Sequence, residues 1–246
     1  MLIDLNQEII SRLSKTELSV IRFINENEEK ILEWSIVEIG YQTFTSPATV
    51  SRAIRKCNVL GFNELRYRCA LKDKEVKHQQ IGNIINQSLL EIQSVMEMLT
   101  IPKILEFTKG IKTSKKIYIF ARGLTEFVAE EFSLKLQLLG YTTLFTRDPN
   151  IMKIISKKLN KEDLLLIFSL NGNTEELIES AKNARWAGAK IAVCCCNKNS
   201  ELVNYSDYLL LGYSDTYTFM EDYEVHSRLP LYAVSRIIVE YLAESK

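Results

Sequence analysis

The pattern of apolar and polar positions changes along the chain and divides it into three zones. Residues 1–74 hold short helical repeats without a clear strand, and residues 75–112 place apolar side chains at helical spacing. From residue 113 to residue 246, short apolar runs alternate with amphipathic segments. Short apolar runs bounded by turn residues predict buried strands, whereas a 3.6-residue period predicts helices. We therefore expect an all-α head, a helical linker and an α/β domain.

Five apolar runs in the last zone predict strands, and we expect a long helix to close the chain from about Tyr223. Strands that alternate with amphipathic helices predict a parallel sheet covered by helices on both faces, an αβα sandwich. In such sheets, ligands bind at the carboxyl ends of the strands, near a topological switch point. The five runs are Lys116–Ala121, Tyr141–Phe145, Asp163–Phe168, Lys190–Cys196 and Tyr208–Leu211.

The linker has an apolar face at helical spacing. This face either packs on its own domain or also contributes to a dimer interface, and the pattern is compatible with both. Its members are Ile81, Ile84, Ile85, Leu89, Ile92, Val95, Met96 and Leu99.

The head shows the start signals of three helices. Ser14 with Glu17, and Ser35 with Glu38, match the capping box, in which the serine and the glutamate each bond an amide of the first turn. A third helix opens at Ser46-Pro47, where serine suits the N-cap and proline suits the first helical position.

The third helix separates an inner face from an outer face. Val50, Ala53 and Ile54 can face a core, and Asn58 can take the left-handed conformation that follows a helix. A short turn before a helix with an exposed hydroxyl and basic face is the geometry of a DNA recognition helix. The outer face would carry Thr49, Ser51, Arg52, Arg55 and Lys56, with Ser46 at its start.

Local charge supports this interpretation, although the chain has 31 basic and 31 acidic residues and no net charge. Between residues 51 and 72 there are six basic residues and one acid, Glu64, a local net charge of +5. Phosphates favour such a patch. The alternative is a solvated face on an ordinary helical bundle, and the acidic Glu26, Glu28 and Glu29 nearby count in its favour.

Composition narrows the class of protein further. The 246 residues are 46% hydrophobic, enough for a full core, and no apolar run is long enough to span a bilayer. The start lacks the basic region of a secretory signal, and five cysteines without framework spacing fit a reducing cytoplasm. The two histidines, His78 and His226, lie far apart, and P-loop and dinucleotide motifs are absent. We expect no metal site, no cofactor and no membrane partner.

Two predicted strand-to-helix loops have the composition of an anion site. Ala121–Thr125 contains Arg122 and Gly123, and Ser169–Thr174 contains Asn171 and Gly172. A helix N-terminus offers free N–H groups and a positive dipole end, and hydroxyls beside it add donors. The alternative is plain N-capping of the two helices by Thr125 and Thr174.

Two other groups carry weaker signals. We expect Cys194, Cys195 and Cys196 to be small buried apolar residues at a strand end. His226 with Glu224 and Glu221 would form an acid/base set on the last helix, or else simply hydrogen-bond near its start.

Several segments, taken in order, match one family. In the head these are LSKTEL, SIVEIG, TSPATVSR and GFNELRYRCAL; later come ARGLT, which resembles GxGxS, SLNGNT, which resembles SxSGxT, and HSRLPLYAV. Over nearly its whole length the chain resembles RpiR-type (MurR/RpiR) bacterial transcription regulators. That family joins an N-terminal helix-turn-helix domain to a C-terminal SIS (sugar isomerase) domain.

The resemblance implies a cytoplasmic regulator that binds operator DNA, senses a phosphorylated sugar, assembles as a dimer or tetramer and has no catalytic residues. Its domains would be 1–74, 75–112 and 113–246. A sugar-phosphate isomerase is the alternative function, with Glu175, Glu176, Glu224 and His226 as candidate acids and bases. The residues expected to contact DNA are Ser46, Thr49, Ser51, Arg52 and Arg55, joined by Lys56. Those expected to hold the sugar phosphate are Thr125, Ser169, Asn171 and Thr174, joined by Arg122, Gly123 and Gly172.

The chain departs from the family pattern at both sites. Ala121 replaces the first glycine of GxGxS, Thr125 replaces its serine, and Asn171 replaces the second serine of SxSGxT. These changes keep polar groups, so an anion site is still expected. In the head, the turn Gln42–Phe44 is atypical, and Cys57–Val59 stands where the family has LGF.

Overall fold

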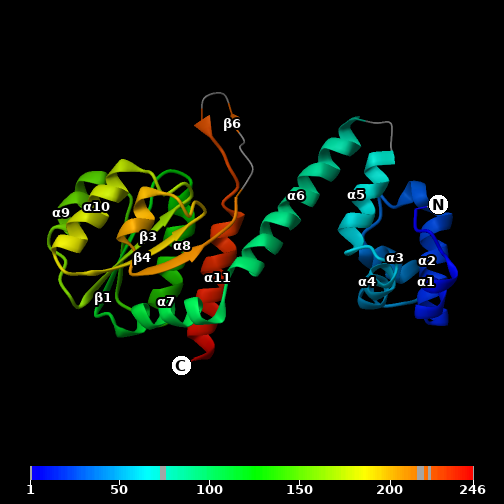
Figure 1. Ribbon diagram of the computed structural model, residues 1–246, viewed down its shortest axis with the longest axis horizontal. Helices are drawn as coiled ribbons and strands as arrows, with labels where there is room; N and C mark the ends of the chain where they lie inside the picture. The colour runs from blue at the N-terminus through cyan, green and yellow to red at the C-terminus, as the bar shows by residue number, and fades with distance from the viewer. Residues whose placement is uncertain (1, 73–75, 215–218, 221–222, 246) are drawn as a thin grey trace. The chain divides into compact units, whose positions relative to one another are not determined.

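The computed structural model describes residues 2–72, 76–214, 219–220 and 223–245, and it divides into two compact units. The units are Met1–Leu89 and Leu90–Lys246, and the division falls within the long helix α6, Val76–Met98 (Figure 1). No helix of the described chain is long and apolar enough to cross a membrane.

Helices are the regular secondary structure of the first unit in its described residues, as the sequence predicts. Both predicted capping boxes are present: Ser14 with Glu17 opens α2, and Ser35 with Glu38 opens α3. The core contains buried isoleucines, valines and leucines from α2, α3, α4 and α5. The helices are α1 Gln7–Arg12, α2 Lys15–Glu26, α3 Ile36–Gln42, α4 Pro47–Lys56 and α5 Phe62–Lys72, with a 3₁₀ turn at Glu28–Lys30.

Helix α4 begins and ends where the sequence predicts. The Ser46 hydroxyl accepts a hydrogen bond from the Thr49 N–H at 3.1 Å, and Pro47 occupies the first turn. Val50, Ala53 and Ile54 are fully buried and pack in the core of the head, which confirms the inner face. Asn58 follows the helix with φ 59°, the left-handed conformation expected after a helix end.

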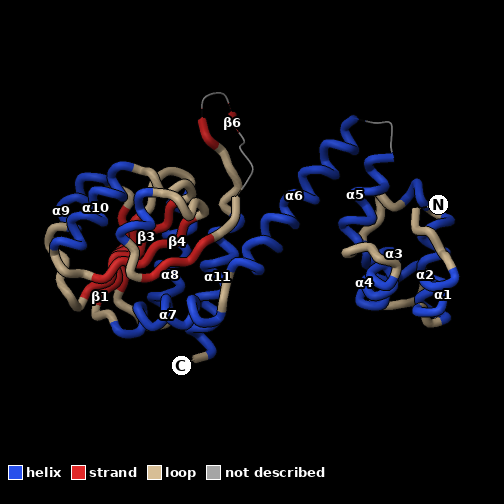
Figure 2. Tube along the Cα trace, in the orientation of Figure 1, coloured by secondary structure: helices blue, strands red, loops and turns tan. Residues whose placement is uncertain are grey.

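The second unit is an αβα sandwich around a five-stranded parallel sheet, again as predicted (Figure 2). The strand order is β2-β1-β3-β4-β5, and every adjacent pair is parallel. The strands are β1 Lys116–Phe120, β2 Thr143–Thr146, β3 Asp163–Ser169, β4 Lys190–Cys195 and β5 Tyr208–Leu211.

Helices cover both faces of this sheet because successive side chains of a strand point to opposite sides. Along β3, Leu164, Leu166 and Phe168 pack toward one helical layer, whereas Leu165 and Ile167 pack toward the other. The first layer comprises α7 Ile101–Thr113, α8 Thr125–Leu138 and α11 Leu229–Glu244, and the second comprises α9 Pro149–Ser156, α10 Glu175–Trp186 and a 3₁₀ turn at Glu201–Tyr205.

The last helix starts later than the sequence indicated. Helix α11 begins at Leu229, whereas Tyr223–Glu224 forms strand β7, which pairs antiparallel with β6, Phe219–Met220. Pro230 fits this start, since proline is tolerated in the first turn of a helix, where its missing N–H leaves no hydrogen bond unmade. The placement of His226 and Glu224 on the last helix was therefore wrong. Glu221, the third member of that set, lies outside the described residues.

Candidate functional sites

In the head, α3, a four-residue turn and α4 form the helix-turn-helix arrangement. Ser46, Arg52 and Arg55 are exposed, and Thr49 and Ser51 are half-buried on the same helix. Arg52 Nη2 donates to the Thr49 hydroxyl at 3.3 Å. The outer face of α4 thus presents hydroxyls and guanidinium groups to solvent, as the sequence predicts.

The basic residues of the head differ in their partners. Lys56 Nζ lies 2.7 Å from Glu17 Oε2, Arg68 pairs with Glu64, and Lys72 Nζ lies 3.8 Å from a Glu28 carboxylate oxygen. Arg52 and Arg55 instead bond uncharged oxygens: the Thr49 hydroxyl and, at 3.2 Å, the Leu60 carbonyl. Arg66, on α5, likewise donates to a carbonyl, that of Trp34. On α4, the positive charge is therefore less compensated at Arg52 and Arg55 than at Lys56.

The Lys56–Glu17 pair connects the end of α4 to the start of α2. Glu17 is only 6% exposed, and its carboxylate also accepts the Ser14 N–H at 2.8 Å. The hydrogen bond from Lys56 first, and that from the Ser14 N–H second, lower the pKa of Glu17. Lys56 thus has a stabilising role that its predicted place on the DNA face did not reveal.

In the second unit, the two predicted loops meet at the switch point of the sheet. Strands β1 and β3 are neighbours, yet the chain leaves β1 toward α8 on one face and leaves β3 toward α10 on the other. The carboxyl ends of such strands leave a crevice between them. A pocket of about 260 Å³ lies there, lined by Arg122, Gly123, Leu124, Thr125, Ser169, Leu170, Asn171, Thr174 and Arg228.

The loop after β3 is shaped by its own polar groups. The buried Ser169 hydroxyl accepts the Gly172 N–H at 3.0 Å, and Gly172 has φ 66°. A Cβ at Gly172 would lie 2.2 Å from the Ser200 hydroxyl oxygen, so only glycine fits this path. Thr174 is the N-cap of α10, but its side chain makes no capping hydrogen bond. Plain capping therefore does not account for Thr174, which is one of the residues that line the pocket.

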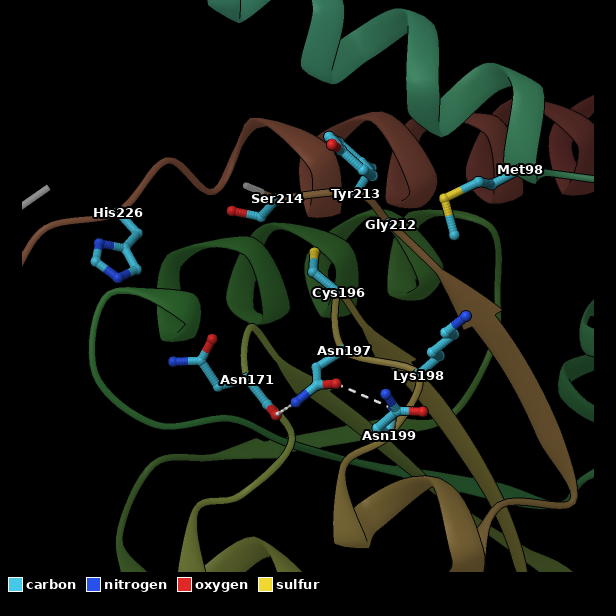
Figure 3. A pocket seen from close by; sticks show the side chains of 10 residues that line it. All are labelled: Met98, Asn171, Cys196, Asn197, Lys198, Asn199, Gly212, Tyr213, Ser214 and His226. Carbon is cyan, nitrogen blue, oxygen red and sulfur yellow. Dashed lines mark hydrogen bonds between the residues drawn. The ribbon is translucent and has the colours of Figure 1, made fainter. Parts of the chain in front are cut away.

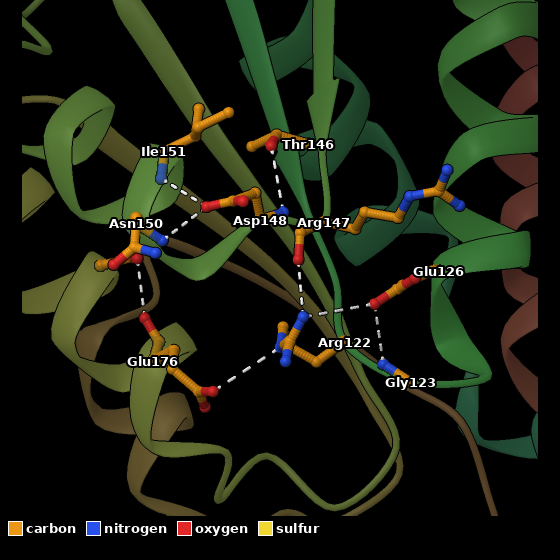
Figure 4. Close-up of polar contacts among 10 residues, drawn as sticks. Arg122, Gly123, Glu126, Thr146, Arg147, Asp148, Asn150, Ile151 and Glu176 are labelled. Atoms are coloured by element: carbon orange, nitrogen blue, oxygen red, sulfur yellow. Dashed lines mark hydrogen bonds and ion pairs between the residues drawn. The ribbon is translucent and has the colours of Figure 1, made fainter.

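Two carboxylates, those of Glu126 and Glu176, lie beside the loop after β1 (Figure 4). Arg122 donates to the Arg147 carbonyl at 2.6 Å, and its guanidinium lies 3.6 Å from Glu126 and 3.7 Å from Glu176. Glu126 also accepts the Gly123 N–H at 3.1 Å. In this arrangement the charge of Arg122 is largely compensated, and the first loop is a weaker anion site than its sequence indicates.

Arg228 is the pocket residue that the sequence interpretation missed. It precedes α11, donates to the Thr125 hydroxyl at 3.4 Å and donates to the His226 carbonyl at 2.6 Å. It therefore adds a cation beside the hydroxyl of the first loop. The available signal was its place in the segment HSRLPLYAV, which matched the family but was assigned no role.

Figure 3 shows the lining of a second cavity, of about 440 Å³. Asn171 lines this cavity as well as the first. Asn197 Nδ2 donates to the Asn171 carbonyl at 3.4 Å, and the wall also carries Asn199, Lys198 and His226. Burial raises the pKa of the Cys196 thiol in this wall to about 12, so it stays protonated and is not a nucleophile at neutral pH. The cavity thus offers amides and one lysine rather than an activated nucleophile.

Comparison with known proteins agrees with this architecture. Residues 110–216 match the SIS domain. An uncharacterised HTH-type transcriptional regulator of Clostridium perfringens is 25% identical over 95% of this chain and 89% of its own length. The similarity thus spans both units rather than the SIS domain alone.

Two solved structures show the same fold. The Vibrio vulnificus NanR protein, complexed with ManNAc-6P, has a TM-score of 0.60 at 20% identity, covering 96% of this chain and 89% of that chain. The sugar isomerase domain of an RpiR transcription factor from Sphaerobacter thermophilus has a TM-score of 0.62 at 15% identity, covering 68% of this chain and 91% of that chain. The chain therefore joins a helix-turn-helix head to a SIS domain, and over nearly its whole length it is similar to HTH-type transcriptional regulators.

Proposed function

We propose that this regulator binds operator DNA through the outer face of α4. A phosphorylated sugar, bound at the switch point of the SIS sheet, would raise or lower its affinity for that DNA. The pocket between the loops after β1 and β3 carries this proposal. There the start of α10, whose N-cap hydroxyl makes no capping bond, and the cationic Arg228 line the same crevice. A helix N-terminus with added donors is suited to a phosphate.

The phosphate of the effector would lie against the Ser169–Thr174 loop, with Thr125 and Arg228 on the opposite side. The rest of the sugar would extend into the adjoining cavity, because Asn171 lines both spaces. Amides such as Asn197 and Asn199 are donors and acceptors suited to neutral sugar hydroxyls. The bound ManNAc-6P of the Vibrio vulnificus relative supports a ligand of this class.

For DNA, Ser46, Thr49, Ser51, Arg52 and Arg55 are the proposed contacts. Arg52 and Arg55 are the strongest because no carboxylate among the described ion pairs of the head binds them. Lys56 would add long-range attraction, since Glu17 compensates its charge.

We further propose a homodimer or higher oligomer and keep the boundaries 1–74, 75–112 and 113–246 for the domains. On the predicted apolar face of the linker, Val95 is buried, whereas Ile81, Ile84 and Leu89 are exposed. Apolar side chains exposed along one helix support the interface alternative for this face. Such a regulator would act in the cytoplasm, where its DNA is.

A titration tests the proposal. Duplexes are first selected by the wild-type protein from a random-sequence library, and binding is followed by fluorescence anisotropy with and without hexose and N-acetylhexosamine 6-phosphates. We expect at least one sugar phosphate to change the affinity for DNA, whereas its unphosphorylated sugar and inorganic phosphate do not. Only a ligand that binds the two states unequally can produce this change. Selection of no sequence, or indifference to every sugar phosphate, would contradict the proposal.

The same incubations test the isomerase alternative, which a phosphoheptose isomerase of similar fold from Francisella tularensis keeps open. An isomerase needs an acid or base at the sugar carbons. His226 lines the second cavity, and Glu176 is paired with Arg122. We expect no isomerised product by chromatography, and turnover that His226→Ala abolishes would favour the enzyme.

A further inference from the structure

The turn between α3 and α4 exposes an aromatic side chain in an unfavourable backbone conformation. Phe44 is 98% exposed and has φ 52°, in the left-handed region that bulky residues rarely adopt. Asn58 is the other described non-glycine residue with positive φ, and asparagine tolerates it. Phe44 therefore neither packs in the fold nor suits its backbone, so the folded state gains nothing visible from this side chain.

The turn forces the conformation on Phe44. The Thr45 N–H donates to the Gly40 carbonyl at 2.8 Å, and the Thr43 hydroxyl donates to the Ile39 carbonyl at 2.7 Å. A Cβ at Gly40 would lie 2.9 Å from the Thr45 carbonyl oxygen, so α3 and the start of α4 are in close contact. Strain of this kind persists where the surroundings over-determine it, and such positions cluster at functional sites.

The surroundings of Phe44 indicate what it would contact. It lies two residues before Ser46, the N-cap of α4, and three residues after Tyr41, which is exposed on α3. From residue 39 to residue 63 the sequence has three basic residues and no acid. An exposed ring at the edge of a cationic, hydroxyl-bearing face is placed for a polyanion that also offers an apolar group. In the major groove of DNA, that group is the C5-methyl of thymine.

We propose that Phe44 is a specificity-determining residue that packs on a thymine methyl group at the edge of the operator half-site. The inference rests on the proposed DNA-binding role of α4. It explains why a phenylalanine occupies a position where glycine would be less strained. The folded head would be more stable with glycine at this position, and the ring would contribute only in the complex.

Phe44→Gly and Phe44→Asn test this, because both residues accept the left-handed backbone and neither carries a ring. On wild-type-selected duplexes we expect both variants of the full chain to bind roughly tenfold more weakly, with an unchanged salt dependence, since an apolar contact releases no counterions. Phe44→Tyr, which keeps the ring, should bind within about twofold of wild type. The urea midpoint of the head, followed by fluorescence of Trp34, should rise in Phe44→Gly; Trp186 is 92% exposed and should change little.

The duplex supplies the second half of the test. Replacing single thymines by deoxyuridine removes only the methyl group, and we expect about fourfold weaker wild-type binding at one position. Phe44→Gly should no longer distinguish thymine from deoxyuridine there. Equal affinity of Phe44→Gly and wild type would overturn this inference alone, and altered self-association with unchanged DNA affinity would assign the ring to a second copy of the chain. If the wild type selects no sequence at all, the DNA-binding proposal fails, and this inference fails with it.

Discussion

Helices α4 and α10 both begin with a hydroxyl residue, but the two hydroxyls are used differently. The Ser46 hydroxyl closes the start of α4 by accepting the Thr49 N–H, whereas the Thr174 side chain makes no capping bond at the start of α10. Ser46 is exposed, and Thr174 lines a pocket. Because the start of α4 is capped by its own Ser46 hydroxyl, recognition of DNA at this helix would depend on side chains further along it. The start of α10 has no such side-chain cap, so its N–H donors can bind a ligand in the pocket.

The largest expected effect is at the capped helix. Arg52→Ala should weaken binding to selected DNA by about 1–3 kcal/mol if the guanidinium reads a base, and by a smaller and uniform amount if it contacts phosphate. Anisotropy titrations on selected and unrelated duplexes separate these cases. Arg236→Ala, which removes an exposed guanidinium from the SIS unit, is the matched control and should have no effect. Operator affinity equal to wild type in Arg52→Ala would remove this residue from the interface.

At the uncapped helix, Thr174→Val should weaken binding of the effector sugar phosphate by about 1.5–3 kcal/mol, because a hydrogen bond to a charged group is lost. DNA affinity without effector should be unchanged. Calorimetric titration measures the first quantity and anisotropy the second. Thr113→Val, which deletes a hydroxyl bonded only within α7, serves as the control. An unaltered sugar response in Thr174→Val would place the phosphate elsewhere.

The two helix starts should also differ in how much each N-cap hydroxyl contributes to the free energy of unfolding. Ser46→Ala should cost the head about 1 kcal/mol in its free energy of unfolding, because a capping bond is lost. Thr174→Ala should cost the SIS unit much less, since no such bond exists there. Urea unfolding of each full-length variant gives both numbers. Equal losses in the two variants would show that Thr174 does cap α10 in solution.

The smallest expected effect is on the stability of the head at acidic pH. The pKa of Glu17 is lowered in the folded head, so its ionised carboxylate stabilises the fold at pH values above its unfolded pKa of about 4.3. This contribution is lost as the pH falls through the lower pKa of the folded state. Lys56→Met removes the main cause, so the loss should begin at a higher pH and amount to less than about 1 kcal/mol, since Lys56 is 41% exposed. Trp34 fluorescence in urea at stepped pH measures it. Arg12→Met, which breaks a surface pair with Glu8, should leave the profile unchanged.

Local patterns made most of the fold predictable. The capping boxes at Ser14 and Ser35, and the buried and exposed faces of α4, depend on residues within one or two turns. The place of the loops after β1 and β3 at the carboxyl ends of strands was also predictable, although that the two strands are neighbours came from the structure. These features need only periodicity, capping chemistry and one topological rule.

What the sequence did not reveal depends on partners far apart in the chain. Lys56 and Glu17 are 39 residues apart, and Arg228 meets Thr125 across 103 residues. Arg122 looked available as an anion ligand until its carboxylate neighbours were placed beside it. Pro230 was the overlooked local signal, since it fits the first turn of α11, whose late start leaves His226 outside that helix.

The close approach of Gly172 to Ser200 restricts how this binding loop can diversify. Since any side chain at position 172 would collide with the Ser200 hydroxyl, the path of the backbone is set before a ligand arrives. New ligand preferences would have to arise by substitution of neighbouring residues such as Asn171, without a change in the path of the backbone. In this chain, a change of ligand preference would therefore leave the backbone of the loop unchanged and alter only the side chains beside Gly172.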